Sequence, residues 1–194
     1  MELTPLWKYI AHYVDLSDRE IAIISDHLKI RTYLKGQFIV QQGDVCKYDN
    51  FILAGSTKTF LTDAQGKEHI VMLAVENWWT SDLGSFITQK PADYHVQCLE
   101  QTTVVQFSHE SFELLFQEVP KFERFFRLIL QKAFVESQNR IVGNLSLPAK
   151  ERYLKFCKQY PRIEQRVPQY LIASYLGITK QFLSKIRAEL MIDE

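Results

Sequence analysis

The sequence lacks any run of about 18 apolar residues, so it predicts no membrane-spanning helix. It has only three cysteines, Cys46, Cys98 and Cys157, and their odd number and wide spacing fit neither a disulfide framework nor a CxxC metal site. The first residues show no basic segment followed by an apolar one, so no secretory signal is predicted. These absences predict a cytoplasmic protein in a reducing compartment, without a membrane partner.

The chain also has no net charge, since 23 Lys and Arg balance 23 Asp and Glu over 194 residues. The balance is uneven along the chain. Residues 1–147 hold 14 basic and 18 acidic side chains, whereas residues 148–194 hold 9 and 5. A split of this size also arises by chance, but it predicts that a polyanion would bind the C-terminal part. The 46% of apolar residues is enough for a globular core.

Short β-branched and aromatic runs, separated by glycine-containing turns, fill residues 29–108. Turns every eight to twelve residues predict an all-β sandwich, roll or barrel, and no alternation of strands with helices is visible. Asp63-Ala64-Gln65-Gly66 is a predicted hairpin turn. The predicted strands cover residues 37–40, 50–53, 57–62, 68–75, 94–99 and 102–107.

Helical patterns flank this β segment. Residues 3–13 form one predicted helix, and Ser17 with Glu20 forms the capping box of a second. A short helix is predicted from Ser108, and Pro120 then opens a long one whose broad phenylalanine-rich stripe must be buried. The pattern leaves open whether this stripe packs only on its own β unit or also on a second copy.

A hinge is predicted where the long helix ends. We expect Gly143 to interrupt the helix and Leu147-Pro148 to end it. A further helix is predicted over residues 149–159, followed by a turn at Tyr160-Pro161-Arg162 and two more helices.

The spacing of residues 169–186 predicts a helix–turn–helix. Ala173 is small where two helices would cross, and Gly177, four residues later, suits the left-handed turn between them. Thr179 is the predicted N-cap of the second helix. Lysine, arginine and glutamine side chains at the start of such a helix can read base edges in the major groove of DNA. An ordinary helical hairpin with a basic surface is the alternative. The predicted DNA-binding residues are Thr179, Lys180, Gln181, Ser184, Lys185 and Arg187.

With this motif after a glycine-punctuated β unit, nearly the whole chain resembles the Crp/Fnr family of bacterial transcription regulators. The resemblance lies in the order and spacing of Gly36, Gln42-Gly43-Asp44 and residues 52–56, 65–68, 82–86 and 142–145. It implies an α+β protein with an N-terminal double-stranded β-helix, or jelly roll, of the cyclic-nucleotide-binding type. A long dimerisation helix and an all-α helix–turn–helix domain would follow. The implied domains are residues 1–118, 119–147 and 148–194.

The sequence departs from the family at the phosphate-binding cassette. The Gly-Glu pair of nucleotide-binding members is replaced here by Ser81-Asp82, and the Arg-Ser pair by Ala92-Asp93. Without the arginine, a buried cyclic phosphate would be unpaired and would face Asp93. We therefore predict that cyclic AMP is not bound with the family's usual affinity and that no cofactor is held. The resemblance places any effector pocket at Ser81, Asp82, Leu83, Gly84, Ala92, Asp93, Gln138 and Asn139, and leaves the effector unidentified.

The sequence does not favour an iron–sulfur or a haem sensor. Three cysteines cannot supply the four thiolates of an iron–sulfur cluster, and no arrangement of the five histidines favours haem. The aromatic residues Trp78, Trp79, Phe86 and Tyr94 near the cassette fit core packing better than ligand stacking.

The predicted domain lacks the full β-hairpin wing of the family, because the sequence stops directly after the recognition helix, as in a short-form member or a truncated chain. Phosphate contacts would then fall to other basic side chains, namely Lys150, Arg152, Lys155, Arg162 and Arg166.

The sequence therefore predicts a homodimeric, sequence-specific regulator that binds a palindrome in double-stranded DNA, with RNA polymerase as a further candidate partner. A ligand-binding or protein-interaction β-roll without DNA readout is the alternative. An enzyme is not predicted, since His69 and His95 stand alone and no GxSxG, HExxH or P-loop motif is present.

Overall fold

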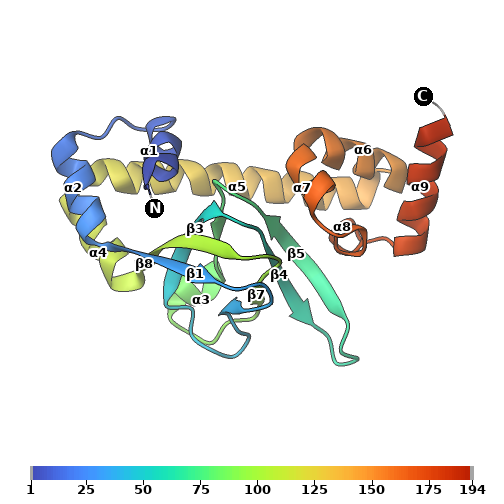
Figure 1. Cartoon of the computed structure of the whole chain (residues 1–194), viewed down its shortest axis with the longest axis horizontal. Helices are drawn as coiled ribbons and strands as arrows, with labels where there is room; N and C mark the ends of the chain where they lie inside the picture. The colour runs from blue at the N-terminus through green and yellow to red at the C-terminus, as the bar shows by residue number, and fades with distance from the viewer. Residues whose placement is uncertain (1, 193–194) are drawn as a thin grey trace.

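A computed structural model describes residues 2–192 of the chain. Its centre is a sandwich of two antiparallel four-stranded sheets (Figure 1). The first sheet has the order β1 (Leu28–Tyr33), β8 (Thr102–Ser108), β3 (Tyr48–Ala54) and β6 (Trp79–Thr80). The second has the order β2 (Phe38–Val40), β7 (His95–Cys98), β4 (Thr57–Thr62) and β5 (Glu68–Ala74).

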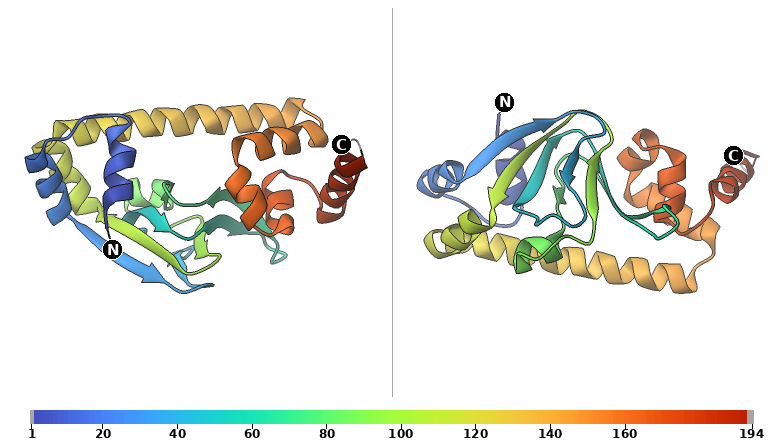
Figure 2. Two further views of the ribbon diagram at one scale, coloured as in Figure 1. Left: turned by 45° about the horizontal axis from the view of Figure 1, so that its top comes forward. Right: turned by 90° about the horizontal axis from the view of Figure 1, so that it is seen from below.

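Helices gather at the two ends of this sandwich and are joined by one long helix that runs beside it (Figures 1 and 2). At the N-terminal end lie α1 (Thr4–Ala11), α2 (Asp18–Asp26) and α4 (His109–Glu118), while the short α3 (Leu83–Thr88) follows β6. The long helix is α5 (Pro120–Ser146). The C-terminal helical unit comprises α6 (Ala149–Gln159), α7 (Pro161–Arg166), α8 (Gln169–Tyr175) and α9 (Lys180–Ile192).

The main core lies between the first sheet, the N-terminal helices and the first half of α5. Phe51, Phe107, Phe122 and Phe125 are completely buried there, and Leu6 of α1 closes the end. The ring of Trp79 lies 5.5–6.2 Å, between centroids, from three of these phenylalanines and 4.7 Å from Phe126. Aromatic contacts at these distances stabilise a core beyond the area they bury.

A second core joins the C-terminal helical unit to the second sheet. Phe60 and Ile70 of the sheet share it with Phe156 of α6 and Ile172 of α8. Ser174 of α8 accepts a hydrogen bond from the backbone N–H of Ile70 at 3.2 Å. The helical unit is therefore packed on β4 and β5, and α9 lies at the outer end of the molecule (Figure 2).

The long helix α5 has one buried and one exposed apolar side. Phe122, Phe125, Phe126 and Ile129 are buried against the chain itself. At about 100° per residue, a second set of apolar side chains falls on the opposite side. This exposed set consists of Leu130, Phe134, Val135, Ile141, Val142 and Leu145, with Leu145 83% exposed.

Local signals in the sequence are confirmed at several element ends. The capping box of Ser17 and Glu20 is present, Ser108 caps α4, and Pro120 begins α5. Two expectations are wrong. Gly143 does not interrupt α5, because its backbone remains helical as far as Ser146. The segment expected as a turn at residues 160–162 instead begins α7, since Pro161 fits the first helical position.

No helix in the described part of the chain is both long and apolar enough to cross a bilayer.

Candidate functional site

The corner between α8 and α9 is fixed by local backbone geometry. Gly177 has φ of +68°, a left-handed conformation that a side chain would strain. The N–H of Ile178 donates to the carbonyl of Ala173 at 3.0 Å, which closes the end of α8. Thr179 Oγ1 accepts from the N–H of Phe182 at 3.1 Å, which confirms Thr179 as the cap of α9. The corner predicted from the alanine–glycine spacing is therefore present.

The α9 helix presents its polar side outward. Leu183 and Ile186 are buried in the second core, with 1% and 3% of their surfaces exposed. The predicted residues Gln181, Ser184 and Lys185 are all exposed on the other side. Phe182, which was not among the predicted residues, is also 47% exposed beside them. The amide, hydroxyl and ammonium groups of this face point to solvent and have no partner among the described residues.

The beginning of α9 borders the tip of the β4–β5 hairpin. The exposed residues Thr179 and Lys180 line a groove of about 680 Å³ whose opposite wall includes Lys67, Glu68 and His69. The start of the helix is thus open to solvent but faces the hairpin.

Arg187 is placed differently from the other predicted residues of α9. Its guanidinium donates to Glu164 of α7 at 3.1 Å, and its side chain is 33% exposed. It therefore ties α9 to α7, and a contact with another molecule would compete with this ion pair.

Two further basic residues are held by the sandwich. Arg162 and Arg166 of α7 donate to Glu76 at 2.6–2.8 Å, and Arg166 also pairs with Glu100 at 2.9 Å. We call these four residues the Glu76 cluster. Burial alone would raise the pKa of Glu76, but hydrogen bonds from Arg166 and from the Gly55 N–H outweigh it and hold the pKa at about 2. The partners lie 86–90 residues apart, so no local pattern could have predicted them.

Arg152, another predicted phosphate contact, holds the ends of two helices. Its guanidinium donates to the carbonyl of Leu147 at 2.9 Å and to that of Leu176 at 3.2 Å. These are the C-terminal cap residues of α5 and α8, whose carbonyls lack partners within their own helices. Arg152 therefore fixes the corner of the helical unit against the end of α5.

The cassette is organised around the carboxylate of Asp82, which is 3% exposed. Asp82 accepts from the backbone N–H groups of Ser85 at 2.9 Å, Asp93 at 2.8 Å and Tyr94 at 3.0 Å. Backbone N–H groups arranged in this way can hold a phosphate. Here a carboxylate of the chain already occupies three of them.

The other predicted pocket residues differ in their exposure and contacts. Leu83 and Gly84 are exposed on α3, Ala92 is buried, and Ser81 is hydrogen-bonded to Asp49. The two predicted residues of α5, Gln138 and Asn139, are both exposed, and Asn139 also lines a cavity between α5 and α6.

The aromatic residues near the cassette act mainly as core. Phe86 is 3% exposed and packs on Phe112 at 5.3 Å, and Trp79 lies in the main core. Trp78 has a role that the sequence did not reveal, because its ring meets Tyr160 at 5.4 Å and so joins the sandwich to the helical unit. Within residues 2–192, no group of three or more His, Cys, Asp or Glu side chains is placed to hold a metal ion.

Comparison with known proteins finds a described domain family that the sandwich resembles. Residues 30–119 match the family model of the cyclic nucleotide-binding domain. No curated protein matches the chain in sequence.

Solved structures resemble the chain over most of its length. The c-di-GMP-responsive global regulator CLP of Xanthomonas campestris superposes with a TM-score of 0.73 at 15% identity, covering 91% of this chain and 93% of CLP. FixK2 of Bradyrhizobium japonicum gives 0.71 at 14% identity, covering 86% and 85%. The catabolite activator protein of Thermus thermophilus gives 0.60 at 17% identity, covering 95% and 87%.

The fold expected from the sequence is thereby confirmed in its main parts, a cyclic-nucleotide-binding-type sandwich followed by a long helix. These neighbours are regulators and not enzymes. Residues 30–119 therefore resemble the cyclic nucleotide-binding domain, and the chain as a whole shares the fold of these regulators.

Proposed function

We propose that the protein is a homodimeric transcription regulator that reads a palindromic site in double-stranded DNA and does not respond to cyclic AMP. The observation that carries the proposal is the α8–α9 corner. It holds the polar face of α9 outward at the end of the molecule, where no other described element covers it.

The chemistry of that face suits the major groove. Gln181 can donate and accept at adenine, and Lys185 can donate to the oxygen and nitrogen acceptors of guanine. Lys180 and Ser184 can contact phosphate oxygens on either side. The exposed ring of Phe182 adds an apolar surface of the kind that packs against a thymine methyl group.

A second copy of the chain is the partner that best fits the exposed side of α5. The apolar set from Leu130 to Leu145 runs along the side of α5 that faces away from the chain's own core. Parallel pairing of two such helices buries both stripes, and contiguous exposed apolar surface of this kind marks interaction sites. It also relates two α9 helices by a twofold axis, as a palindrome requires.

The cassette supports the cyclic AMP part of the proposal. A cyclic phosphate entering there would displace the Asp82 carboxylate from three backbone N–H groups and would find no arginine in the Ala92 position. The cost of burying the displaced carboxylate opposes binding. Titration calorimetry with cyclic AMP should therefore show no binding at micromolar concentrations, and a micromolar dissociation constant would contradict this part.

The DNA part is tested by selecting bound duplexes from a random pool and measuring the affinity of the selected site. Lys185→Ala should weaken specific binding by about tenfold and lower the salt dependence, because one ammonium contact is lost. Lys90→Ala is the matched control, since Lys90 is an exposed lysine of the sandwich, far along the chain from α9. Failure to enrich any sequence, or equal effects of the two substitutions, would favour a β-roll module without DNA readout.

A further inference from the structure

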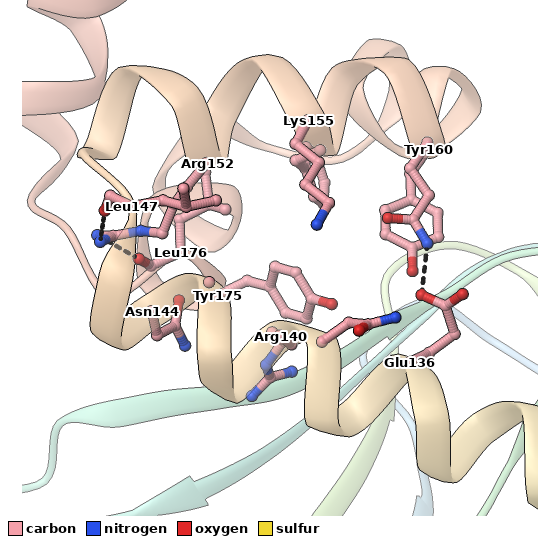
Figure 3. Close-up of a pocket in the computed structure, with 13 residues that line it drawn as sticks. Glu136, Arg140, Asn144, Leu147, Arg152, Lys155, Tyr160, Tyr175 and Leu176 are labelled. Atoms are coloured by element: carbon pink, nitrogen blue, oxygen red, sulfur yellow. Dashed lines mark hydrogen bonds between the residues drawn. The ribbon is translucent and has the colours of Figure 1, made fainter.

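A cavity of about 70 Å³ lies between the second half of α5 and α6, closed on one side by α8 (Figure 3). It is separate from the cassette and from the polar face of α9. Its lining contains three cationic side chains, Arg140, Arg152 and Lys155, and one carboxylate, Glu136. Glu136 is already engaged, since it accepts from Gln159 at 2.7 Å.

Several hydrogen-bond donors of this lining have no partner within residues 2–192. The Lys155 ammonium and the hydroxyls of Tyr160 and Tyr175 point into the space between α5 and α6 (Figure 3), and none of them is hydrogen-bonded or ion-paired to a described side chain or backbone group. Asn144 of α5 adds an unpaired amide. Donors from three different helices therefore face one cavity.

Arg152 borders the inner side of the cavity. Its two Nη atoms are used by the carbonyls of Leu147 and Leu176, whereas its Nε is buried and has no partner. A buried N–H group without an acceptor is costly, and proteins normally satisfy such groups. An acceptor in the cavity would reach this N–H only after a shift of the Arg152 side chain, because less than 1 Å² of the Nε atom is accessible.

The set of donors indicates which kind of ligand suits the cavity. The unpaired groups are an ammonium, a guanidinium N–H, an amide and two phenols, all of which can donate to oxygen. The lining carries more positive than negative charge, so it favours an anion. The volume equals about two waters at roughly 30 Å³ each, which is enough for one small oxyanion group.

We propose that this cavity binds a phosphate group, either inorganic phosphate or the phosphate of a small ester. Lys155, Asn144, Arg152 and the two tyrosine hydroxyls are its ligands. A bound phosphate bridges α5 to α6 and α8, and so stiffens the connection at Leu147–Pro148. An effect of this stiffening on DNA affinity rests on the proposed function, whereas the binding of phosphate to the cavity does not.

The test is titration calorimetry of the full chain with inorganic phosphate, without DNA and at constant ionic strength. We expect saturable binding with a dissociation constant of about 1 mM or tighter. A parallel titration with glycerol phosphate distinguishes the two sources, because tighter binding of the ester assigns the site to a phosphate ester and weaker binding assigns it to free phosphate. Acetate at the same ionic strength should not bind.

Two variants of different kinds assign the binding to the cavity. Lys155→Met should weaken phosphate binding about tenfold by removing one charge-assisted hydrogen bond. Gly143→Leu should abolish it by filling the cavity, since the nearest neighbour that a Cβ at Gly143 would meet is Leu147 Cδ1 at 3.8 Å. Lys158→Met is the control, because Lys158 is exposed on the same helix but does not line the cavity.

Absence of phosphate binding by the unaltered chain would overturn the proposal. So would equal binding by the Lys155→Met and Lys158→Met variants, or retention of binding by a folded Gly143→Leu variant. Because DNA is absent from these titrations, their failure would leave the proposed function standing, and failure of DNA selection would leave the phosphate site standing.

Discussion

Gly55 is the glycine with the least room for a side chain. Its φ of +103° lies in a region that L residues rarely adopt, and a Cβ built there would stand 2.5–2.7 Å from Thr102 and the carbonyl of Gln101. Gly66 in the β4–β5 turn also has a positive φ, of +79°, but a Cβ there would meet nothing within 4 Å. A side chain at Gly66 would therefore cause backbone strain alone, whereas a side chain at Gly55 would cause both backbone strain and steric overlap.

Alanine substitution at these two glycines should give different losses of stability. Gly66→Ala should lower the free energy of unfolding by about 1 kcal/mol, the strain of a left-handed alanine. Gly55→Ala should lower it by at least about 3 kcal/mol, because overpacking adds to that strain. Urea denaturation measures both values, and equal losses would show that the close approach at Gly55 has no energetic weight.

Asp49 of β3 is a buried carboxyl group, with 4% of its surface exposed. Burial raises its pKa to about 6, although hydrogen bonds from Ser81 and the Asn50 N–H act in the opposite direction. Since the folded pKa lies above that of the unfolded chain, folding favours the protonated form. The stability that this group contributes is fully present below about pH 4 and is lost as the pH rises through 6.

Asp49→Asn should therefore flatten the pH dependence of stability. Between pH 4 and pH 7 the unaltered chain should lose on the order of 3 kcal/mol of unfolding free energy relative to the variant, as a shift of about two pKa units implies. Thermal or urea unfolding at several pH values measures the difference. Parallel pH profiles for the two proteins would contradict the assignment.

At the scale of elements, the sequence predicts those strands that are bounded by turns. β4 is predicted over its full length, because turns bound it and its apolar residues are β-branched or aromatic. β1 was missed, because it follows α2 with almost no break and four of its six residues are exposed at the sheet edge. β6 was missed because it has only two residues.

In the candidate site, too, features with local sequence signals were predicted and contacts between distant residues were not. The α8–α9 corner was predicted because its signals, Ala173, Gly177 and Thr179, lie within seven residues. The pairing of Arg162 and Arg166 with Glu76 was not, because it depends on how the helical unit packs on the sandwich. Local chemistry is visible in one sequence, whereas contacts between distant elements are not.

The Glu76 cluster should hold the helical unit against the sandwich. Glu76→Gln removes the charge that Arg162 and Arg166 share, and the partly exposed pairs together contribute on the order of 1 kcal/mol. Hydrogen exchange in α7 and α8 should then be about fivefold faster at low salt, with a smaller difference at high salt. Glu113→Gln, at an exposed carboxylate of α4, is the control. Unchanged hydrogen exchange in the Glu76→Gln variant would show that the Glu76 cluster does not hold the helical unit against the sandwich.

At the scale of the whole molecule, α5 connects the parts of the proposed mechanism. One side of the helix completes the main core through Phe122 and Phe125. Its second half meets α6 at the proposed phosphate cavity, and its opposite side leaves Leu145 and its apolar neighbours exposed. A change at the junction of α5 and α6 would therefore alter how two α9 helices are presented to DNA.

A charge on the exposed side of α5 should break the proposed dimer. Leu145→Glu should raise the dimer dissociation constant at least tenfold, because two carboxylates would be buried against an apolar stripe. Analytical ultracentrifugation measures the dissociation constant. Leu34→Glu, at a 61% exposed leucine of the sandwich, should leave it unchanged. A purely monomeric unaltered chain at micromolar concentration would contradict the dimer itself.

The most direct test of the central claim is the dependence of DNA binding on half-site spacing. Two copies related by a twofold axis place their α9 helices in successive major grooves, about 34 Å or one turn apart. Fluorescence anisotropy on the selected palindrome should show strong specific binding. Insertion of about five base pairs, half a turn, between the half-sites should reduce affinity to the level of a scrambled duplex. Equal affinity for the original and the lengthened palindrome would contradict the claim that two α9 helices read the DNA together.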